Sequence, residues 1–119
     1  MNYYNMKIND KFLDSVMTGV KTHEFRLNNA FNNNIIIGDK LVLISTTVAN
    51  HLVKVTIKSI MKYKTWEEAI SSNWNDFKDV FIDIPAALKE CSMFYSKESV
   101  IRNGIICFGI ELDKDQSKL

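Results

Sequence analysis

The sequence predicts an α+β domain in which mostly antiparallel strands are flanked by short helices. Residues 52–58 and 105–112 alternate apolar and polar side chains with the period of a β-strand. Residues 11–18 and 86–94 instead space their apolar side chains as an amphipathic helix does. The length of 119 residues suits one hydrophobic core. We therefore expect a single domain over residues 1–119.

The first expected elements are a short strand at residues 6–8 and the helix that follows it. Asn9 or Asp10 can cap this helix, because a short side-chain oxygen accepts an otherwise free backbone N–H. Gly19 is expected just beyond its end, where only glycine adopts a positive φ without strain. The apolar face that we assign to the core consists of Phe12, Leu13, Val16 and Met17, with Val20 as a further candidate.

The stretch after Gly19 combines charged side chains with the start of a predicted strand. The alternation places Thr22, Glu24 and Arg26 on one face of that strand. Lys21 precedes it, at the turn. The residues expected on the opposite, core-facing side are His23, Phe25 and Leu27. Such a cluster is most often a solvated face of ion pairs, and the alternative is a binding site at the end of a sheet.

A polar loop and two strands are expected next. The asparagine-rich residues 28–34 predict a loop, which is either one wall of a site or a plain surface connection. Gly38 and Asp39 predict a turn, and the apolar run 41–44 predicts a strand buried on both faces. The side chains expected to point outward from strand 52–58 are Lys54, Thr56 and Lys58. These lysines either extend a basic surface or deter edge-to-edge pairing.

Helical segments are expected between residues 65 and 94. Thr65 and Glu68 form a capping box, in which each side chain accepts a backbone N–H of the other residue. A helical piece follows, whose aromatic side chains indicate packing rather than base stacking: Trp74, Phe77 and Phe81. Pro85 can open the next helix at its first position, where a missing N–H is tolerated.

The C-terminal part predicts a turn, a closing strand and a tail. Asn103 and Gly104 are a strong turn signal before the strand at residues 105–112. Gly109 inside that strand indicates a bend in a barrel or the close approach of another group. Residues 113–119 are charged, and we expect them to fray.

Charge and cysteine content limit the classes of function. With 15 basic and 14 acidic side chains the net charge is +1, which argues against tight, non-specific binding of duplex nucleic acid. The first residues lack a signal-peptide pattern and no apolar run approaches transmembrane length, so we expect a cytoplasmic protein with no membrane partner. Cys91 and Cys107 are then free thiols. With only His23 and His51 and no Cys-x-x-Cys, we expect neither a metal site nor another cofactor.

The chain lacks glycine-rich phosphate loops, a His-Glu-x-x-His pair and a recognisable Ser/His/Asp arrangement. What remains is the pattern Gly-x-Lys-Thr-x-Glu-x-Arg, formed by Gly19, Lys21, Thr22, Glu24 and Arg26. This pattern after a short helix resembles the signature of ASCH domains, which belong to the PUA-like superfamily. Segments 37–43, 52–60 and 104–111 extend the resemblance over most of the chain.

The resemblance implies both a fold and a function. The fold would be a small PUA-like β-barrel of about five or six mostly antiparallel strands with flanking helices. The function would be binding of RNA or a nucleotide in a charged cleft, with the ligand-binding residues Lys21, Thr22, Glu24 and Arg26. Chemically, the planar fork of Arg26 matches a phosphate or a base edge, and Lys21 adds a point charge. Glu24 can accept a hydrogen bond from a base amino group or hold Arg26 in place.

The alternative function is a hydrolase acting on RNA or on a modified nucleoside. Some small ASCH-like proteins are amidohydrolases that act on acetylated cytidine, and they resemble this chain in the Gly-x-Lys-Thr stretch. Their pattern has a threonine nucleophile where this chain has Glu24, and a carboxylate cannot act as that hydroxyl, so the activity is not carried over. Lys21 and Glu24 could still serve general acid–base hydrolysis. A third interpretation is a protein-interaction module whose charged face is inert.

Overall fold

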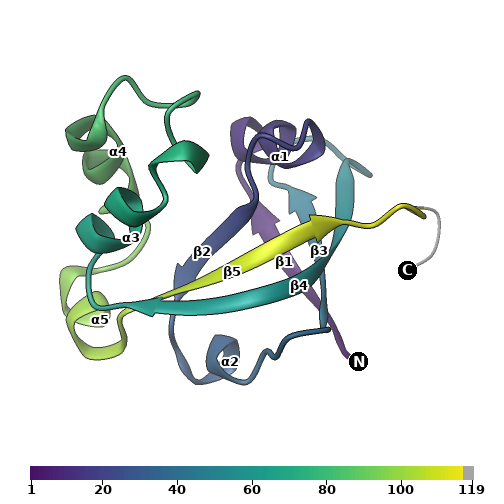
Figure 1. The fold of residues 1–119 in the computed structure, drawn as a ribbon, viewed down its shortest axis with the longest axis horizontal. Helices are drawn as coiled ribbons and strands as arrows, with labels where there is room; N and C mark the ends of the chain where they lie inside the picture. The colour runs from purple at the N-terminus through teal and green to yellow at the C-terminus, as the bar shows by residue number, and fades with distance from the viewer. Residues whose placement is uncertain (117–119) are drawn as a thin grey trace.

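The computed structural model describes residues 1–116 and consists of a curled sheet with helices around it (Figure 1). Its strands are β1 (Tyr3–Ile8), β2 (His23–Leu27), β3 (Lys40–Ser45), β4 (Leu52–Tyr63) and β5 (Ile105–Leu112). Its helices are α1 (Asp10–Met17), α2 (Ala30–Asn33), α3 (Trp66–Ser72), the 3₁₀ turn η1 (Trp74–Asp76), α4 (Ile84–Cys91) and α5 (Lys97–Asn103).

The five strands lie in the order β1-β3-β4-β5-β2, so the first two strands of the chain form the two edges of the sheet. β1 runs parallel to β3, and the other three neighbouring pairs are antiparallel. The sheet curls into a half-barrel with its two edge strands on either side of the opening. The predicted α+β class with five, mostly antiparallel strands is therefore confirmed.

Strand β4 is longer than predicted and contains a β-bulge. It continues to Tyr63, and its register with β5 shifts between Ile57 and Ser59. At the shift Ser59 lies opposite Gly109, where an added Cβ would overlap with Ser59 Oγ. Both features expected at Gly109 thus occur together, because a bulge bends the strand and brings a neighbouring side chain close.

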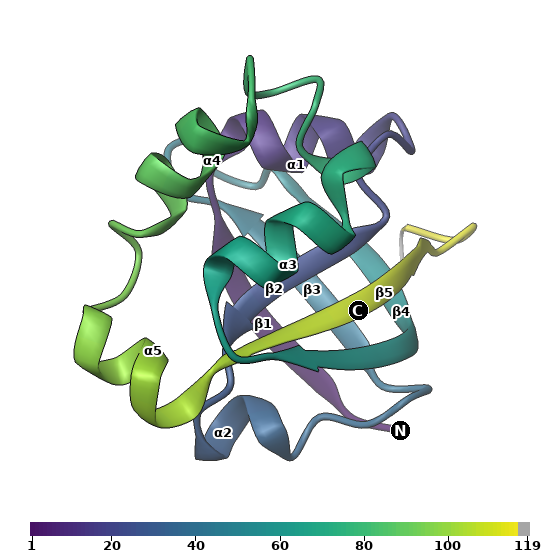
Figure 2. The same cartoon turned by 60° about the vertical axis from the view of Figure 1, so that its left-hand side comes forward.

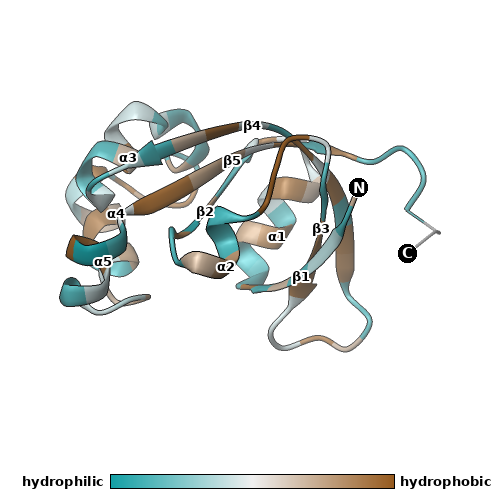
Figure 3. Cartoon of the chain, turned by 90° about the horizontal axis from the view of Figure 1, so that it is seen from below, coloured by the Kyte–Doolittle hydropathy of each residue, from teal (hydrophilic) through white to brown (hydrophobic). Residues whose placement is uncertain are grey.

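Helices cover one face and both ends of the sheet (Figure 2). α3 packs on α4 and lies against β4 and β5, whereas α1 lies against β3 and β4. α2 is at the end of the sheet opposite to α1. Figure 3 shows hydrophobic stretches along β4 and β5 and in the segment that leads into β3. The core is one cluster, and its fully buried members include Leu13, Leu41, Leu43, Val55, Ile57, Ile70, Ile105 and Phe108.

Helix starts follow the predicted capping chemistry. The Asn9 side chain accepts the amide of Lys11 at the start of α1. Thr65 Oγ1 accepts the amide of Glu68 at 3.1 Å at the start of α3. Pro85 is the second residue of α4 rather than the first, because Asp83 supplies the cap. These local signals fix where each helix begins.

Two short helices occupy segments that the sequence predicts to be irregular. The loop expected at residues 28–34 contains α2, because Asn29 Oδ1 accepts the amide of Asn32 and caps a helical turn. The turn expected at Asn103 is the end of α5, which Ser96 caps and Gly104 terminates with φ +74°. By contrast, the prediction of a helical piece that extends through Phe81 is wrong, since only the short 3₁₀ turn η1 forms in that segment.

Burial differs from prediction at the end of the first helix and on strand β4. Met17 and Val20 are 45% and 41% exposed, because the face of α1 that is buried ends at Val16. Lys54, predicted to point into solvent, is 1% exposed. The hypothesis that Lys54 extends a basic surface is therefore wrong, although Lys58 is exposed as predicted.

Residues from the predicted tail lie over Lys54. Gln116 bonds with its side chain to both the amide and the carbonyl of Lys54, and Asp113 donates its amide to the same carbonyl. The carboxylate of Asp113 accepts from Thr56 and Lys40 at 2.6 and 2.9 Å. Residues 113–116 thus form no helix or strand but do bond to β4, and residues 117–119 of the predicted tail lie outside the described part of the chain.

Candidate ligand-binding site

A cavity of about 280 Å³ lies between edge strands β1 and β2, helices α1 and α3, and the segment after α4. The residues that line it are Lys7, Ile8, Asn9, Phe12, Lys21, Glu24, Phe25, Arg26, Trp66, Phe77, Cys91, Phe94 and Tyr95. Three of the four predicted site residues are among them. The structure therefore brings Lys21, Glu24 and Arg26 together in one concave place.

Lys21 is the most unusual group in this cavity, because its side chain is buried among aromatic rings. The residue is 4% exposed. Its Nζ lies 4.7 Å from the ring centre of Phe25 and 5.6 Å from those of Phe12 and Phe77. A desolvated ammonium over aromatic faces gains about 2 kcal/mol from each good contact of this kind. The helix end at Gly19 and the following turn carry Lys21 inward from the first helix to β2.

Glu24 and Arg26 form an ion pair on the face of β2 that lines the cavity. Arg26 Nη2 donates to Glu24 Oε2 at 3.0 Å and to the backbone carbonyl of Lys7 at 2.8 Å. The second bond joins β2 to β1, the two edges of the sheet, across the opening of the half-barrel. Glu24 Oε1 accepts the amide of Phe25 at 2.9 Å. The pair is buried more deeply than a half-exposed strand would allow, since Glu24 is only 5% exposed.

The surroundings keep both members of the pair charged. Burial opposes ionisation of Glu24, but the charges of Arg26 and Lys21 and the two hydrogen bonds outweigh it, so the pKa of Glu24 is lowered. Burial likewise works to lower the pKa of Arg26, and the carboxylate of Glu24 together with Tyr95 raises it above its ordinary value. At neutral pH the cavity thus contains the ion pair of a carboxylate and a guanidinium.

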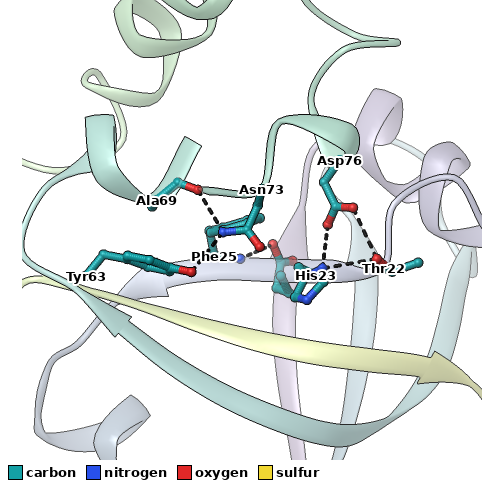
Figure 4. Close-up of polar contacts among 8 residues, drawn as sticks. Thr22, His23, Phe25, Tyr63, Ala69, Asn73 and Asp76 are labelled. Carbon is teal, nitrogen blue, oxygen red and sulfur yellow. Dashed lines mark hydrogen bonds and ion pairs between the residues drawn. The ribbon is translucent and has the colours of Figure 1, made fainter. Parts of the chain in front are cut away.

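Thr22, the fourth predicted site residue, does not line the cavity. Its hydroxyl donates to Asp76 Oδ1 at 3.1 Å, and His23 Nδ1 lies 3.0 Å from Asp76 Oδ2 (Figure 4). In the same view Asn73 joins α3 to β4 through Ala69 and Tyr63. Burial of Asp76 is outweighed by the bond from His23 and the charge of Lys21, so the pKa of Asp76 is lowered. Thr22 therefore links the start of β2 to the segment after α3 through its hydrogen bond to Asp76. The predicted loop, residues 28–34, does not line the cavity either.

Acid should destabilise the protein through these carboxylates. Because folding lowers the pKa of Glu24 and of Asp76, their ionised forms stabilise the native state above the ordinary carboxyl range, and this stability is lost as the pH falls through the lowered values. We expect the urea midpoint to be flat from neutrality down to that range and to fall below it. Glu24→Gln should make the fall shallower, and an unchanged profile in that variant would contradict the assignment.

Sequence reasoning missed the aromatic and thiol groups of the cavity. Trp66, Phe94 and Tyr95 come from the start of α3 and from the turn after α4, far from the signature in sequence. The one available signal was the adjacent pair Phe94-Tyr95 at a predicted helix end. Cys91 also lines the cavity, and burial raises the pKa of its thiol to about 12, so it is protonated at neutral pH.

Other kinds of site receive no support from residues 1–116. No three His, Cys, Asp or Glu side chains within this range gather closely enough to hold a metal ion. Nor does any helix there have the length and apolar character needed to cross a bilayer.

A five-stranded half-barrel with flanking helices, and a cavity beside the start of its second strand, defines a PUA-like α+β domain. The family model of the ASCH domain matches residues 6–112, and the chain belongs to that family. The resemblance drawn from the signature residues is thereby confirmed.

Solved structures show the same fold. The crystal structure of the hypothetical protein PH0355 has a TM-score of 0.82 at 20% identity and covers 95% of this chain and 100% of its own. The solution structure of protein PF0455 from Pyrococcus furiosus has a TM-score of 0.69 at 21% identity, with 97% and 100% covered. The ASCH protein from Zymomonas mobilis has a TM-score of 0.54 at 13% identity, with 94% and 66% covered. At these identities the structures show the fold alone. A search of curated protein sequences gives no match.

Proposed function

We propose that this ASCH domain binds RNA or a nucleotide, with a single nucleotide entering the cavity that Lys21, Glu24 and Arg26 line. The observation that carries the proposal is the position of Lys21. A nearly buried ammonium with no hydrogen-bond acceptor among residues 1–116 faces a cavity with aromatic walls. The charges of Glu24 and Asp76 act on Lys21, but neither carboxylate accepts a hydrogen bond from it, so its N–H donors remain available for an acceptor on a ligand.

The size and the walls of the cavity suit one nucleotide better than a duplex. Small-molecule sites begin at roughly 300 Å³, close to the volume of about 280 Å³ found here. Aromatic side chains give a base a surface to stack on whatever its sequence context. Arg26 is 20% exposed and lies nearer to solvent than Lys21, so it is placed to meet a phosphate at the mouth. The net charge of +1 is consistent with a local site rather than a long track of phosphates.

No observation on the described residues favours the hydrolase alternative. Glu24 has a lowered pKa, whereas an efficient general acid or base has a pKa near the working pH. The hydroxyl of Thr22 is engaged with Asp76 outside the cavity, and Cys91 is protonated. Hydrolysis of RNA or of a modified nucleoside stays a prediction that an incubation assay with each substrate would test.

Titration of a short single-stranded RNA against variants of the two cations tests the proposal. Lys21→Met keeps a side chain of similar length and removes its charge. Arg26→Gln keeps a polar side chain, although a shorter one, and removes the charge at the mouth of the cavity. We expect each change to weaken binding about tenfold or more, and the two together to abolish it. Fluorescence anisotropy gives the affinities, and the melting temperature shows that each variant is folded.

Lys58→Met is the matched control for this titration, because Lys58 is exposed on β4 and does not line the cavity. Its affinity for RNA should equal that of the wild type. If the folded Lys21→Met/Arg26→Gln double variant binds as tightly as the wild type, the proposed function is wrong.

A further inference from the structure

The cavity contains more unused hydrogen-bond donors than unused acceptors. Arg26 Nε and Trp66 Nε1 are buried without a partner among residues 1–116, and the contacts of Lys21 Nζ in that range are with aromatic rings rather than with an acceptor. The only carboxylate among the lining residues is that of Glu24, and each of its oxygens already accepts one hydrogen bond. Because nearly all buried N–H groups in native proteins are paired, two unpaired ones lining the same cavity point to a missing acceptor.

The unpaired donor of Trp66 is the most informative of the three, since no charge explains it. The residue is 5% exposed and starts α3, and its ring lies 6.2 Å from the rings of both Phe94 and Tyr95. An indole N–H is a donor only, so its partner has to be an oxygen or an unprotonated ring nitrogen. A tryptophan that served only to pack would gain nothing from a buried, unpaired N–H.

A neutral planar ligand matches this donor surplus better than a phosphate does. Eight of the thirteen lining residues are apolar or aromatic: Ile8, Phe12, Phe25, Trp66, Phe77, Cys91, Phe94 and Tyr95. A doubly charged phosphate among them would also stand beside the ionised Glu24. A base offers a flat apolar body with polar groups at its edge, which is the combination that the walls provide.

Among the bases, uracil has the edge that fits best. It presents two ring carbonyls, which accept, on either side of one N–H, which donates. The three donor groups can serve the carbonyls, and the remaining lone pairs of Glu24 can take the N–H. Cytosine has an amino group in place of one of these carbonyls, and adenine has an amino group and no carbonyl at all; an amino group donates and would face further donors.

We propose that the cavity selects a base with two ring carbonyls, as in uracil, and that Trp66 makes the selection by donating its indole N–H to one of them. The inference rests on the proposed function and goes beyond it by naming the base and the selecting residue. Phe94, in the turn between α4 and α5, also lines the cavity and contacts the indole of Trp66 in a T-shaped arrangement. Phe94 is 48% exposed, so this side of the indole lies close to solvent.

Binding of short oligouridylate, oligocytidylate and oligoadenylate by fluorescence anisotropy tests the selection. We expect oligouridylate to bind about tenfold more tightly than oligocytidylate, the factor that one additional hydrogen bond to a ligand provides. Trp66→Phe keeps an aromatic ring and removes the N–H, and it should reduce the preference to about twofold or less. Trp74→Phe is the matched control, because Trp74 is the second of the two tryptophans and does not line the cavity. It should keep the full preference.

The ratio of affinities separates selection from a general loss of stability, which would weaken all three oligonucleotides equally. Equal binding of the three by the wild type, or a preference that survives Trp66→Phe, overturns this inference. RNA binding that still depends on Lys21 and Arg26 would then leave the proposed function standing. If none of the oligonucleotides binds, both the inference and the proposed function are wrong.

Discussion

Replacing Gly104 with alanine is expected to lower the free energy of unfolding by about 2–4 kcal/mol. Gly104 has φ +74°, where an L-residue is strained, and an added Cβ would stand 2.7 Å from the carbonyl oxygen of Tyr63. That oxygen belongs to the backbone at the end of β4, so no side-chain rotation relieves the contact. The amide and the carbonyl of Gly104 also bond to Val100 and Asn28, which ties α5, β5 and the end of β2 to this point.

Gly38→Ala is the control that separates the steric contact with Tyr63 from the backbone strain of a positive φ. Gly38 has φ +95°, but an added Cβ would meet no atom within 4 Å, so only backbone strain of about 1 kcal/mol applies. Urea denaturation of both variants measures the difference. For a chain of this length the larger loss corresponds to a fall in melting temperature of roughly 10 °C. Equal losses in the two variants would show that the approach of Tyr63 does not constrain Gly104.

Glu24→Gln is expected to cost about 3 kcal/mol of stability, although it changes the shape of the side chain very little. The carboxylate compensates two cations, the nearly buried Lys21 and the partly buried Arg26. Without its charge, Lys21 is left in an aromatic enclosure with only Asp76 as a nearby anion among the described residues. An uncompensated charge in such a place is far more costly than the net gain from the intact pair.

A double-mutant cycle with Lys21→Met shows whether this explanation holds. Removing the ammonium in the Glu24→Gln background should restore part of the lost stability, because the uncompensated charge disappears with it. We expect a coupling free energy of at least about 1 kcal/mol from urea denaturation of the four proteins. Additive losses would mean that Lys21 and Glu24 do not interact in the folded protein.

The signature stretch was predictable as a strand start beside a turn, and its family was predictable with it. The burial of its side chains was not predictable, because burial depends on which other segments pack against the strand. Phe12 and Phe77 come from two other parts of the chain and enclose Lys21. Thr22 belongs to the same local pattern as Glu24, yet Asp76 draws it away from the cavity. Alternation along one strand could not separate these two outcomes.

Strand β4 shows the same limit for the burial of a charged residue. Its alternation predicted the strand correctly, but it placed Lys54 in solvent. Gln116, which bonds to the backbone of Lys54, lies about sixty positions later, in the charged end that was expected to fray. Periodicity reports which side chains share a face, whereas burial of that face depends on a partner that is distant in sequence.

The sequence by itself determined the local events: where helices are capped, where glycine turns the chain, and which runs alternate as strands. These depend on neighbours within a few residues, through side-chain caps and backbone sterics. Only the tertiary structure decided that Lys21, Glu24 and Arg26 share a cavity with Trp66 and Tyr95. Curling of the sheet brings its two edge strands and the turn after α4 together, and no local pattern encodes contacts across that distance in the chain.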